Sequence, residues 1–540
     1  MNPSSEESTA TLRRRALDAT SALAIGIGAV AGSYAAVGFR PGFVAAPVST
    51  LVTALTPDAV ITWAILTLGS LGQSLGFVLA VVLTVVGIAA IAESVRRLGE
   101  RSGGDRLAVA LAVAVAVGVA TVAVTTTPLS ALGAGLGAGV VRLVADWPIA
   151  DSTPTPDRRG FLRVAAATVA VAAGGALLGS RSGTGASGSG VGGGSSGDAI
   201  VDRLLAMATD RTFDLPDAEP LVSRQFYQVD INSVDPDLSA EEWSLRVTGA
   251  VDEERELAYD DIADLPAQHR FVTLQCVGDA LNGGKIDTAL WTGVPITDVL
   301  PDLPDECCVM LRAADDYYEE FPMAALRNGF LAYRMNGRPL PRGHGRPVRA
   351  LIPGHWGEIN VKWLTEIEVL EEEADGYWEQ RGWHGTGPVN TVAKLHSVSR
   401  TEAGVRVGGH AYAGTRGIDR VEVSTDGGDT WVEATLSEPL PGAVDAQTGD
   451  SLREEAEDAW RMWEYSYEAA EPHEVVVRAV DGTGTVQTEE EQRAFPRGGD
   501  RLGYPASRPA ELIVIRRPCE SRVVGNGEGA LVPAHGHAWR

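Results

Sequence analysis

The chain has 540 residues, which is too long for one ordinary domain and indicates three or four. Residues 1–199 carry 13 Lys and Arg against 11 Asp and Glu, so residues 200–540 carry 32 against 60, a balance of −28 within the formal net charge of −26. This acidic balance excludes a nucleic-acid-binding protein, which needs a basic surface to neutralise phosphates. The long uncharged apolar runs before residue 180 exclude a simple soluble protein.

Lysine is rare: only Lys285, Lys362 and Lys394 occur, against 42 arginines. An acidic, lysine-poor surface stays hydrated in concentrated salt, where screening weakens charge repulsion. We hypothesise a halophilic source, and an ordinary acidic composition of a GC-rich genome is the alternative.

The N-terminal part predicts a multi-pass membrane region, because a membrane-spanning helix needs about 20 mostly apolar residues. Residues 1–160 are expected to hold about four spans, and residues 161–179 a further one. The apolar runs are Ala16–Phe39, Gly72–Ala92, Leu107–Thr125, the weaker Leu129–Val144, and Phe161–Gly179. Small residues dominate them, which suits close helix packing in lipid. Val60–Leu68 is apolar but short, and we interpret it as interfacial or re-entrant.

The basic residues predict the orientation. Arginines cluster before the first run, between the second and third, and before the last. Five spans with the N-terminus inside place every cluster on the cytoplasmic side, as the positive-inside rule requires. The residues after 180 are then expected on the outer face of the cell membrane.

The segment Asp157–Arg163, with Arg158-Arg159-Gly160-Phe161-Leu162, resembles a twin-arginine export signal. Ordinary positive-inside charge is the alternative. The twin-arginine pathway carries folded proteins, so a passenger can acquire a cofactor before export. No compelling cleavage site follows, and the segment can remain as an anchor. Residues 180–197, rich in Gly and Ser, predict a flexible linker.

The soluble part reads as short strands and turns. His269–Cys276 is a strong strand that ends in a cysteine before a glycine-rich loop. A thiolate at this position suits a soft or high-valent metal, while a buried small apolar residue is the alternative. The four cysteines are too few for a disulfide framework, and adjacent Cys307 and Cys308 are not expected to bridge each other.

The soluble part resembles the sulfite oxidase family of molybdopterin enzymes, over about residues 220–500. Many motifs in the family's order carry this resemblance: Thr273–Gly278, Trp291–Pro295, Phe321-Pro322, Met335–Pro341, His344–Arg349, Pro353–Gly357 and Val361–Leu364. The resemblance implies a molybdenum cofactor with molybdopterin, in which tungsten could replace molybdenum.

The resemblance also implies the site residues. Cys276 matches the cysteine that binds the metal, and Tyr317 matches a tyrosine near the metal's open position, where a phenol can pass a proton. The remaining matches are cofactor-binding residues, whose basic members suit a pterin and its phosphate. They are Phe226, Tyr227, His344, Arg349, His355 and Lys362.

The chain departs from the sulfite-oxidising pattern directly after the metal cysteine. Those members carry arginines there, whereas this chain has Val277, Gly278, Asp279, Ala280 and Leu281. An acidic pocket rim would repel sulfite. A neutral substrate, or a sulfoxide or N-oxide acceptor, is therefore as well supported as sulfite. A sulfite dehydrogenase that uses Arg270 or Arg312 is the rival.

The expected fold is multidomain. An all-α transmembrane N-terminal region precedes an α+β sulfite-oxidase-like molybdopterin domain (198–384) and an all-β immunoglobulin-like sandwich (385–505). The resemblance implies that the sandwich forms a homodimer. Trp431, Trp460 and Trp463 are expected in its core or interface, and Asp445–Asp458 as a solvated acidic insertion. Residues 506–540 form a tail of unknown structure.

These inferences combine into a membrane-anchored, externally facing oxidoreductase. It would transfer an oxygen atom to or from a small-molecule substrate as molybdenum cycles between Mo(VI) and Mo(IV). No haem or iron–sulfur motif occurs, so a separate electron carrier is implied. The alternative from another class is a cofactor-free surface-binding protein that retains the fold.

Overall fold

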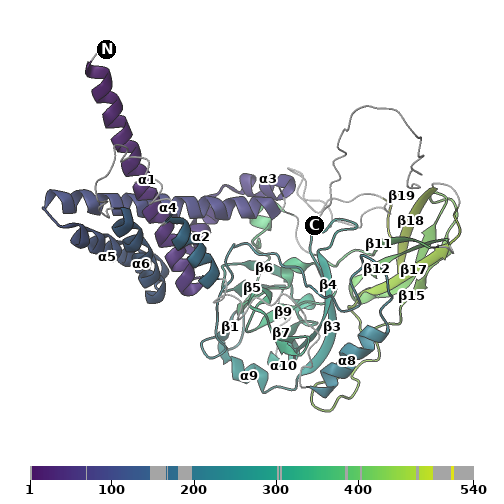
Figure 1. Ribbon diagram of the computed structural model, residues 1–540. Coiled ribbons are helices and arrows are strands. Elements are labelled where there is room, and N and C mark those ends of the chain that lie inside the picture. The colour runs from purple at the N-terminus through teal and green to yellow at the C-terminus, as the bar shows by residue number, and fades with distance from the viewer. Residues whose placement is uncertain are drawn as a thin grey trace, which may run out of the picture.

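The computed structural model describes residues 3–68, 70–145, 166, 168–179, 198–300, 303, 307–383, 387–401, 404–469, 473–489 and 513–515. A helical N-terminal region lies beside a β-rich body that ends in a separate pair of sheets (Figure 1). The twin-arginine-like segment, the linker 180–197 and nearly all of the tail lie outside the described residues.

Four helices of the N-terminal region contain candidate membrane spans by length and composition, as predicted. They are α1 (Pro3–Val37), α4 (Ser70–Arg101), α5 (Arg106–Thr125) and α6 (Pro128–Ala145). Between α1 and α4, α2 (Ala46–Leu55) and α3 (Asp58–Leu68) form a pair bent by 105°, which is a broken span or a re-entrant loop. The last apolar run is described as a short helix, Thr168–Gly179.

Small residues let α1 and α6 approach closely. A Cβ atom added to Gly32 would collide with the backbone carbonyl of Gly133, and one added to Gly137 would lie 2.8 Å from the carbonyl carbon of Gly28. The hydroxyl groups of Ser33 and Ser130 meet at 2.8 Å in the same interface. The close packing expected from the small residues is therefore confirmed for this helix pair.

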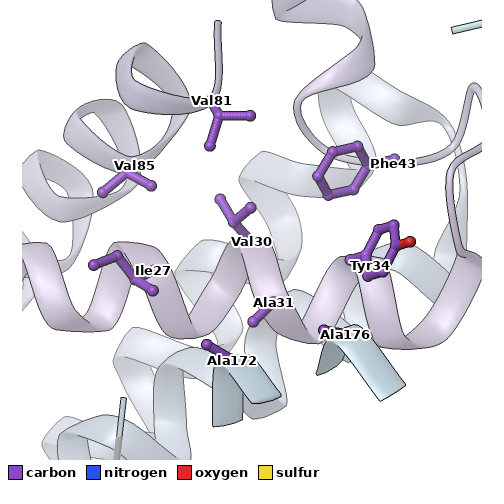
Figure 2. Close-up of a pocket in the computed structure, with 9 residues that line it drawn as sticks. All are labelled: Ile27, Val30, Ala31, Tyr34, Phe43, Val81, Val85, Ala172 and Ala176. Carbon is purple, nitrogen blue, oxygen red and sulfur yellow. The ribbon is translucent and has the colours of Figure 1, made fainter. Parts of the chain in front are cut away.

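An apolar cavity of about 280 Å³ lies between α1, α4 and the helix Thr168–Gly179. Figure 2 shows Val30 and Ile27 of α1 facing Val81 and Val85 of α4, with the Tyr34 ring at one end. The labelled side chains are hydrocarbon except for the Tyr34 hydroxyl. Such a cavity suits lipid-like chains and offers little for polar chemistry.

The helical region touches the body through one end of its helices. The Gln73 amide, near the start of α4, donates to the carbonyl oxygens of Asp230 and Asn232, both at 3.3 Å. Arg342 donates to the carbonyl oxygen of Phe39 at 2.6 Å. Ion pairs Arg40–Asp237 and Arg381–Asp58 complete this contact at 3.4 and 3.3 Å.

Two sheets build the domain that follows helix α8 (Ala199–Asp210). The first has the order β2-β1-β10-β5-β6, and the second runs β16-β3-β4-β7-β8 with β9 on β7. The first sheet contains β1 (Ser244–Gly249), β2 (Arg255–Ala258), β5 (Cys308–Ala313), β6 (Tyr318–Pro322) and β10 (Leu364–Leu370). The second contains β3 (Gln268–Gln275), β4 (Ile286–Pro295), β7 (Phe330–Met335), β8 (Arg338–Pro339), β9 (Arg349–Leu351) and β16 (Val444–Asp445).

Short helical turns connect these strands, and apolar side chains from both sheets pack into one core. The core includes Leu245, Val309, Leu331 and Ile367, all fully buried. The turns are α9 (Tyr259–Ala263), α10 (Ile296–Val299), α11 (Met323–Leu326), η1 (Arg342–His344), η2 (Gly357–Ile359) and η3 (Glu379–Arg381).

The last part of the chain is all-β, as predicted, and consists of two four-stranded sheets. One contains β11 (Val392–Thr401), β12 (Gly404–Tyr412), β15 (Thr435–Leu436) and β17 (Arg461–Tyr467). The other contains β13 (Ile418–Ser424), β14 (Val432–Glu433), β18 (His473–Asp481) and β19 (Ile513–Ile515), and η4 (Gly414–Arg416) precedes β13. Trp463 is buried in the core between the sheets, and Trp460 in the core next to α8. The Arg478 guanidinium stacks on Trp431, with its central carbon 3.9 Å from the centre of the Trp431 ring.

The tail, for which the sequence predicted no structure, contributes β19, which pairs with β18. Two expectations need correction. Cys307 and Cys308 form a disulfide, because the bend before β5 brings their sulfur atoms together. The acidic insertion is not merely solvated: β16 pairs with β3, and the Asp458 carbonyl accepts a hydrogen bond from Thr273 N at 2.8 Å. Backbone pairing with β3 therefore holds both ends of the insertion.

The α1–α6 contact predicts the effect of a single methyl group. We expect Gly137→Ala to destabilise the protein by about 1–3 kcal/mol, because its Cβ would meet the Gly28 backbone. Gly87→Ala on α4, where a Cβ meets nothing within 4 Å, is the matched control and should be neutral or stabilising. Thermal unfolding of the detergent-solubilised full chain measures both, and equal melting temperatures for the two variants would contradict the packing argument.

Candidate functional site

Cys276 directly follows β3, at one end of the second sheet of the domain that follows α8. Its backbone N donates to the Lys285 carbonyl oxygen at 2.9 Å, and its own carbonyl accepts from Asp279 N at 3.0 Å. These bonds hold the cysteine at the mouth of the 277–284 loop. The thiol is free, and burial raises its pKa despite a hydrogen bond from the Gly278 backbone.

Tyr227 lies near this strand end. Its backbone N donates to Asp287 Oδ2 at 2.6 Å. A Cβ added to Gly357 would lie 2.8 Å from the Tyr227 hydroxyl and 3.1 Å from the Gln275 carbonyl oxygen. The Tyr227 hydroxyl and the carbonyl of the residue before Cys276 therefore both lie next to Gly357. Burial and the neighbouring charge of Cys276 both raise the pKa of this phenol.

A buried basic group lies next to Tyr227. Arg349 donates to the carbonyl oxygens of His344 (3.3 Å) and Asn360 (2.9 Å), and its guanidinium carbon lies 5.2 Å from the Trp291 ring centre. Phe226 packs edge-on against both Trp291 and His344. Burial lowers the pKa of Arg349 to about 10 and that of His344 to about 3, so this histidine is neutral.

Lys362 joins this group through Gly345. A Cβ on Gly345, whose φ is +102°, would lie 3.0 Å from Arg349 Cβ and 3.1 Å from Lys362 Cα. Glycine therefore allows the two basic residues to come together. The Lys362 ammonium donates to the carbonyl oxygens of Val229 and Gly343, both at 3.1 Å, and forms an ion pair with Asp230.

Tyr317 and His355 lie farther from this group. The Tyr317 hydroxyl is 2.9 Å from Glu319 Oε2 and 3.0 Å from the carbonyl oxygen of Glu358, so it approaches Cys276 only through the 357–358 turn. The His355 ring nitrogen lies 3.0 Å from the Pro353 carbonyl, and its backbone pairs with Pro388. The structure therefore brings together Cys276, Phe226, Tyr227, His344, Arg349 and Lys362, whereas the hydrogen bonds described for Tyr317 and His355 go to other residues.

A buried ion pair that the motifs did not predict holds the loop after Cys276. Lys394, from β11 of the all-β domain, lies 2.5 Å from Asp279 Oδ2, and the two side chains are 1% and 0% exposed. The same ammonium donates to the carbonyl oxygens of Ala280 and Gly283. The expected acidic pocket rim is therefore wrong, because Lys394 neutralises Asp279 in the interior. The only feature of the sequence that singled out Lys394 was the rarity of lysine in this chain.

The two arginines that could have served a sulfite site are engaged elsewhere. Arg270 bonds Gln268 and stacks on Phe330, 4.7 Å from its ring centre. Arg312 forms an ion pair with Glu368 at 2.5 Å. Neither arginine contacts the group around Cys276.

The site suits a large ligand that brings its own metal donors. Among the described residues, no group of three or more His, Cys, Asp or Glu could hold a metal ion. Arg349 Nε and Gln275 Oε1 are buried without a hydrogen-bond partner. Buried polar atoms normally have partners, and a polar cofactor beside Cys276 would supply them. The residues present therefore fit a pterin cofactor whose metal takes a single thiolate from the protein.

Comparisons with known proteins agree with this chemistry. Residues 232–378 match the model of the oxidoreductase molybdopterin-binding domain, and residues 388–496 match the Mo-co oxidoreductase dimerisation domain. The mitochondrial sulfite oxidase of Mus musculus is 31% identical over 307 residues, covering 47% of this chain and 54% of that protein. The sulfite oxidase of Arabidopsis thaliana is 28% identical over 305 residues, covering 46% and 77%.

The chain spans about half the length of the mammalian relatives that it matches. A nitrate reductase [NADH] of Spinacia oleracea is 29% identical over 262 residues, covering 36% of this chain and 28% of that protein. The solved sulfane dehydrogenase SoxCD of Paracoccus pantotrophus is 20% identical with a TM-score of 0.43, covering 49% of this chain and 74% of that chain.

The buried ion pair predicts a large loss of stability on substitution. Lys394→Met leaves the Asp279 carboxylate buried without its cation, and we expect a cost of about 3–5 kcal/mol. Lys285→Met, at an exposed lysine of the same loop, is the matched control and should cost little. Urea unfolding followed by near-ultraviolet circular dichroism compares them. If the two variants unfold at the same urea concentration, the pair does not fix the loop.

Proposed function

We propose that this chain, which joins a molybdopterin-binding oxidoreductase domain to a Mo-co oxidoreductase dimerisation domain, is a membrane-anchored enzyme that transfers an oxygen atom to or from a small molecule. The observation that carries the proposal is the free Cys276 thiol at a strand end, next to Tyr227 and the buried Arg349. This arrangement offers a single cofactor the soft sulfur ligand of Cys276 and the buried cation Arg349, whose Nε has no hydrogen-bond partner.

In this proposal Cys276 is the protein ligand of the metal. Burial alone favours the thiol over the thiolate, since it raises the pKa of Cys276. A bound metal ion reverses this preference by stabilising the charged sulfur. When bound, the molybdenum cofactor supplies two-electron redox chemistry and accepts or donates the oxygen atom.

The basic group holds the pterin and its phosphate. Arg349 has an unpaired Nε inside the domain, and neutral His344 can donate or accept at a pterin edge. Lys362 forms an ion pair with Asp230, so a phosphate there would compete with this carboxylate. Phe226 and Tyr227 form the wall beside Trp291. We assign His355 to the border with the second domain, because its backbone pairs with Pro388.

Tyr317 is the proton-transferring residue of the proposal, since its hydroxyl is already in a hydrogen-bonded chain. Electrons are exchanged with a separate carrier. Among the described residues, no group of three or more His, Cys, Asp or Glu could hold an additional metal ion to accept them. The Mo-co dimerisation domain is the proposed contact between two copies of the chain.

The helix arrangement supports an extracytoplasmic catalytic domain. Arg96 of α4 and Arg142 of α6 both form ion pairs with Glu100, so these arginines lie close together at one end of the helices. The contacts of Gln73 and Phe39 with the body lie at the other ends of α4 and α1. Because basic residues stay in the cytoplasm, the body lies outside. Gly175 and Gly179 of the last helix lie against Ala31 and Tyr34 of α1, in that order. The last helix therefore runs in the same direction as α1 and also leads outward.

One observation favours sulfite dehydrogenation as a second candidate. Asp279, in the loop after Cys276, is neutralised by Lys394, and a second cation, Lys285, lies near the thiol, whose pKa is raised by burial and lowered less by that charge. An anion therefore meets less repulsion than the sequence of the loop implied. The missing arginines still distinguish this loop from that of sulfite-oxidising members.

Metal analysis tests the cofactor assignment. We expect stoichiometric molybdenum, or tungsten, in the purified full chain and a loss of at least about 10-fold in Cys276→Ser, because the only protein ligand is removed. Cys519→Ser is the control and should keep its metal. Near-zero metal in both the wild type and Cys276→Ser would support the cofactor-free alternative.

Steady-state assays separate the two candidate reactions. We expect turnover with a sulfoxide and a reduced viologen dye, and weak turnover with sulfite and an oxidised dye, because no arginine follows Cys276. Lys285→Met is informative here, since it should weaken sulfite binding and leave a neutral sulfoxide unaffected. Efficient turnover of sulfite alone would favour the dehydrogenase instead.

A further inference from the structure

The ammonium group of Lys362 is fully engaged by hydrogen-bond acceptors. An ammonium has three N–H donors, and three acceptors meet it: the carbonyl oxygens of Val229 and Gly343, both at 3.1 Å, and the carboxylate of Asp230. Two of these acceptors belong to the backbone, whereas the third lies on a side chain. A phosphate can therefore bind Lys362 only by replacing an acceptor, and the Asp230 carboxylate is the one that a bond rotation can remove.

The backbone around Asp230 is held on two sides. Gln73 of α4 donates to the carbonyl oxygens of Asp230 and Asn232, both at 3.3 Å. The Asn232 amide donates in turn to the carbonyl oxygen of Asp315, in the body, at 2.8 Å. Because the helix and the body both anchor this stretch, an exchange of acceptors at Lys362 would move the Asp230 side chain and leave its backbone in place.

The second oxygen of the Asp230 carboxylate is bound by an exposed residue. The Gln228 amide donates to Asp230 Oδ2 at 2.7 Å and lies 3.2 Å from both carboxyl oxygens of Asp235. Asp230 thus contacts Lys362 through Oδ1 and Gln228 through Oδ2, and its side chain is only 8% exposed. Rotation toward Gln228 would carry the carboxylate out of the ion pair while it keeps a hydrogen bond.

Charge balance favours such an exchange. Lys362 and the buried Arg349, which approach each other at Gly345, supply two positive charges. Burial lowers the pKa of Arg349 to about 10, so it stays charged at neutral pH. A phosphate monoester carries about 1.5–2 negative charges there. With Asp230 in place an excess of negative charge would be buried, whereas the phosphate and the two cations nearly balance each other.

Two neighbouring carboxyl groups respond to the charges of this ion pair. The pKa of Asp235 is raised by burial and then by the charge of Asp230, while Lys362 and Arg342 oppose this shift. Burial raises the pKa of Asp315 to about 6; the Asp230 charge adds to the rise and Lys362 opposes it. A phosphate that replaced the Asp230 carboxylate would therefore meet less repulsion than a phosphate added beside it.

We propose that Asp230 and the cofactor phosphate are alternative partners of Lys362. Asp230 pairs with the lysine before the cofactor binds, and its side chain rotates toward Gln228 when the phosphate takes its place. The inference rests on the proposed function and adds a residue that sets how tightly the cofactor is held. Asp230 acts through Lys362, so it is a positioning residue.

Phosphate titration of the cofactor-free full chain tests the exchange without turnover. The chain is made in a host that lacks molybdopterin and purified in a detergent without a phosphate group, and isothermal titration calorimetry measures the Kd of inorganic phosphate. We expect Asp230→Asn to bind phosphate about 10-fold more tightly than the wild type, because no carboxylate has to be displaced. Asp419→Asn, which removes a carboxylate paired with Arg420 in the all-β domain, is the control and should keep the wild-type affinity.

The tighter binding must depend on the lysine. We expect Lys362→Met, added to Asp230→Asn, to cancel the gain in affinity, since the exchange takes place at this ammonium. Removing both partners leaves neither charge unpaired, so the double variant measures binding without a large loss of stability. A gain that persists without Lys362 overturns the proposal, and so does an unchanged phosphate affinity in Asp230→Asn.

Melting temperatures of the cofactor-free and cofactor-loaded full chains distinguish an exchangeable partner from a permanent brace. We expect Asp230→Asn to lower the melting temperature of the cofactor-free chain by a few degrees, because the ion pair with Lys362 is lost. The loaded chain should show no such loss, since its Asp230 has already left the lysine. A loss of equal size in both forms would mean that Asp230 stays on Lys362, against the proposal.

Failure of the proposed function gives a different result. A wild-type chain that contains neither molybdenum nor tungsten, after production in a host that makes molybdopterin, contradicts that function. The phosphate titration of the cofactor-free chain still decides whether Asp230 and phosphate compete for Lys362.

Discussion

The ion pair between Lys394 and Asp279 is the constraint on which the site depends. Both side chains lie inside the protein, in a place where an unpaired charge would be expensive. The aspartate belongs to the loop after Cys276, and the lysine belongs to β11, the first strand of the all-β domain. The loop that carries the thiol can therefore hold its shape only while the two domains are packed together. The pairing of β16, from the later part of the chain, with β3 also joins the two domains.

Sequence patterns predicted the elements whose cause is local. The strand that ends at Cys276, β12, β13 and β18 follow from alternating side chains and from the turns between them. The grouping of Arg349, His344 and Lys362 was predicted by the resemblance and not by periodicity. The structure adds the reason: these residues lie on either side of Gly345, where no side chain separates them.

The features that sequence could not predict depend on contacts between distant residues. Lys394 is 115 residues from Asp279, so neither charge reveals its partner in the chain. The acidic rim was wrong for this reason: the sign of Asp279 was visible, but its burial and its cation were not. The disulfide at Cys307 depends on a local bend that composition does not encode.

The contact between the helices and the body has a consequence for any shortened version of the protein. A fragment starting at residue 198 would lack Gln73, Arg40 and Phe39, so the carbonyls of Asp230 and Asn232 and the side chains of Asp237 and Arg342 would face water. Val234, which packs against the helices, would be uncovered as well. The affected stretch runs on directly from Tyr227 and carries the carboxylate that pairs with Lys362. Removing the helical region from the chain would thus disturb one wall of the proposed cofactor site.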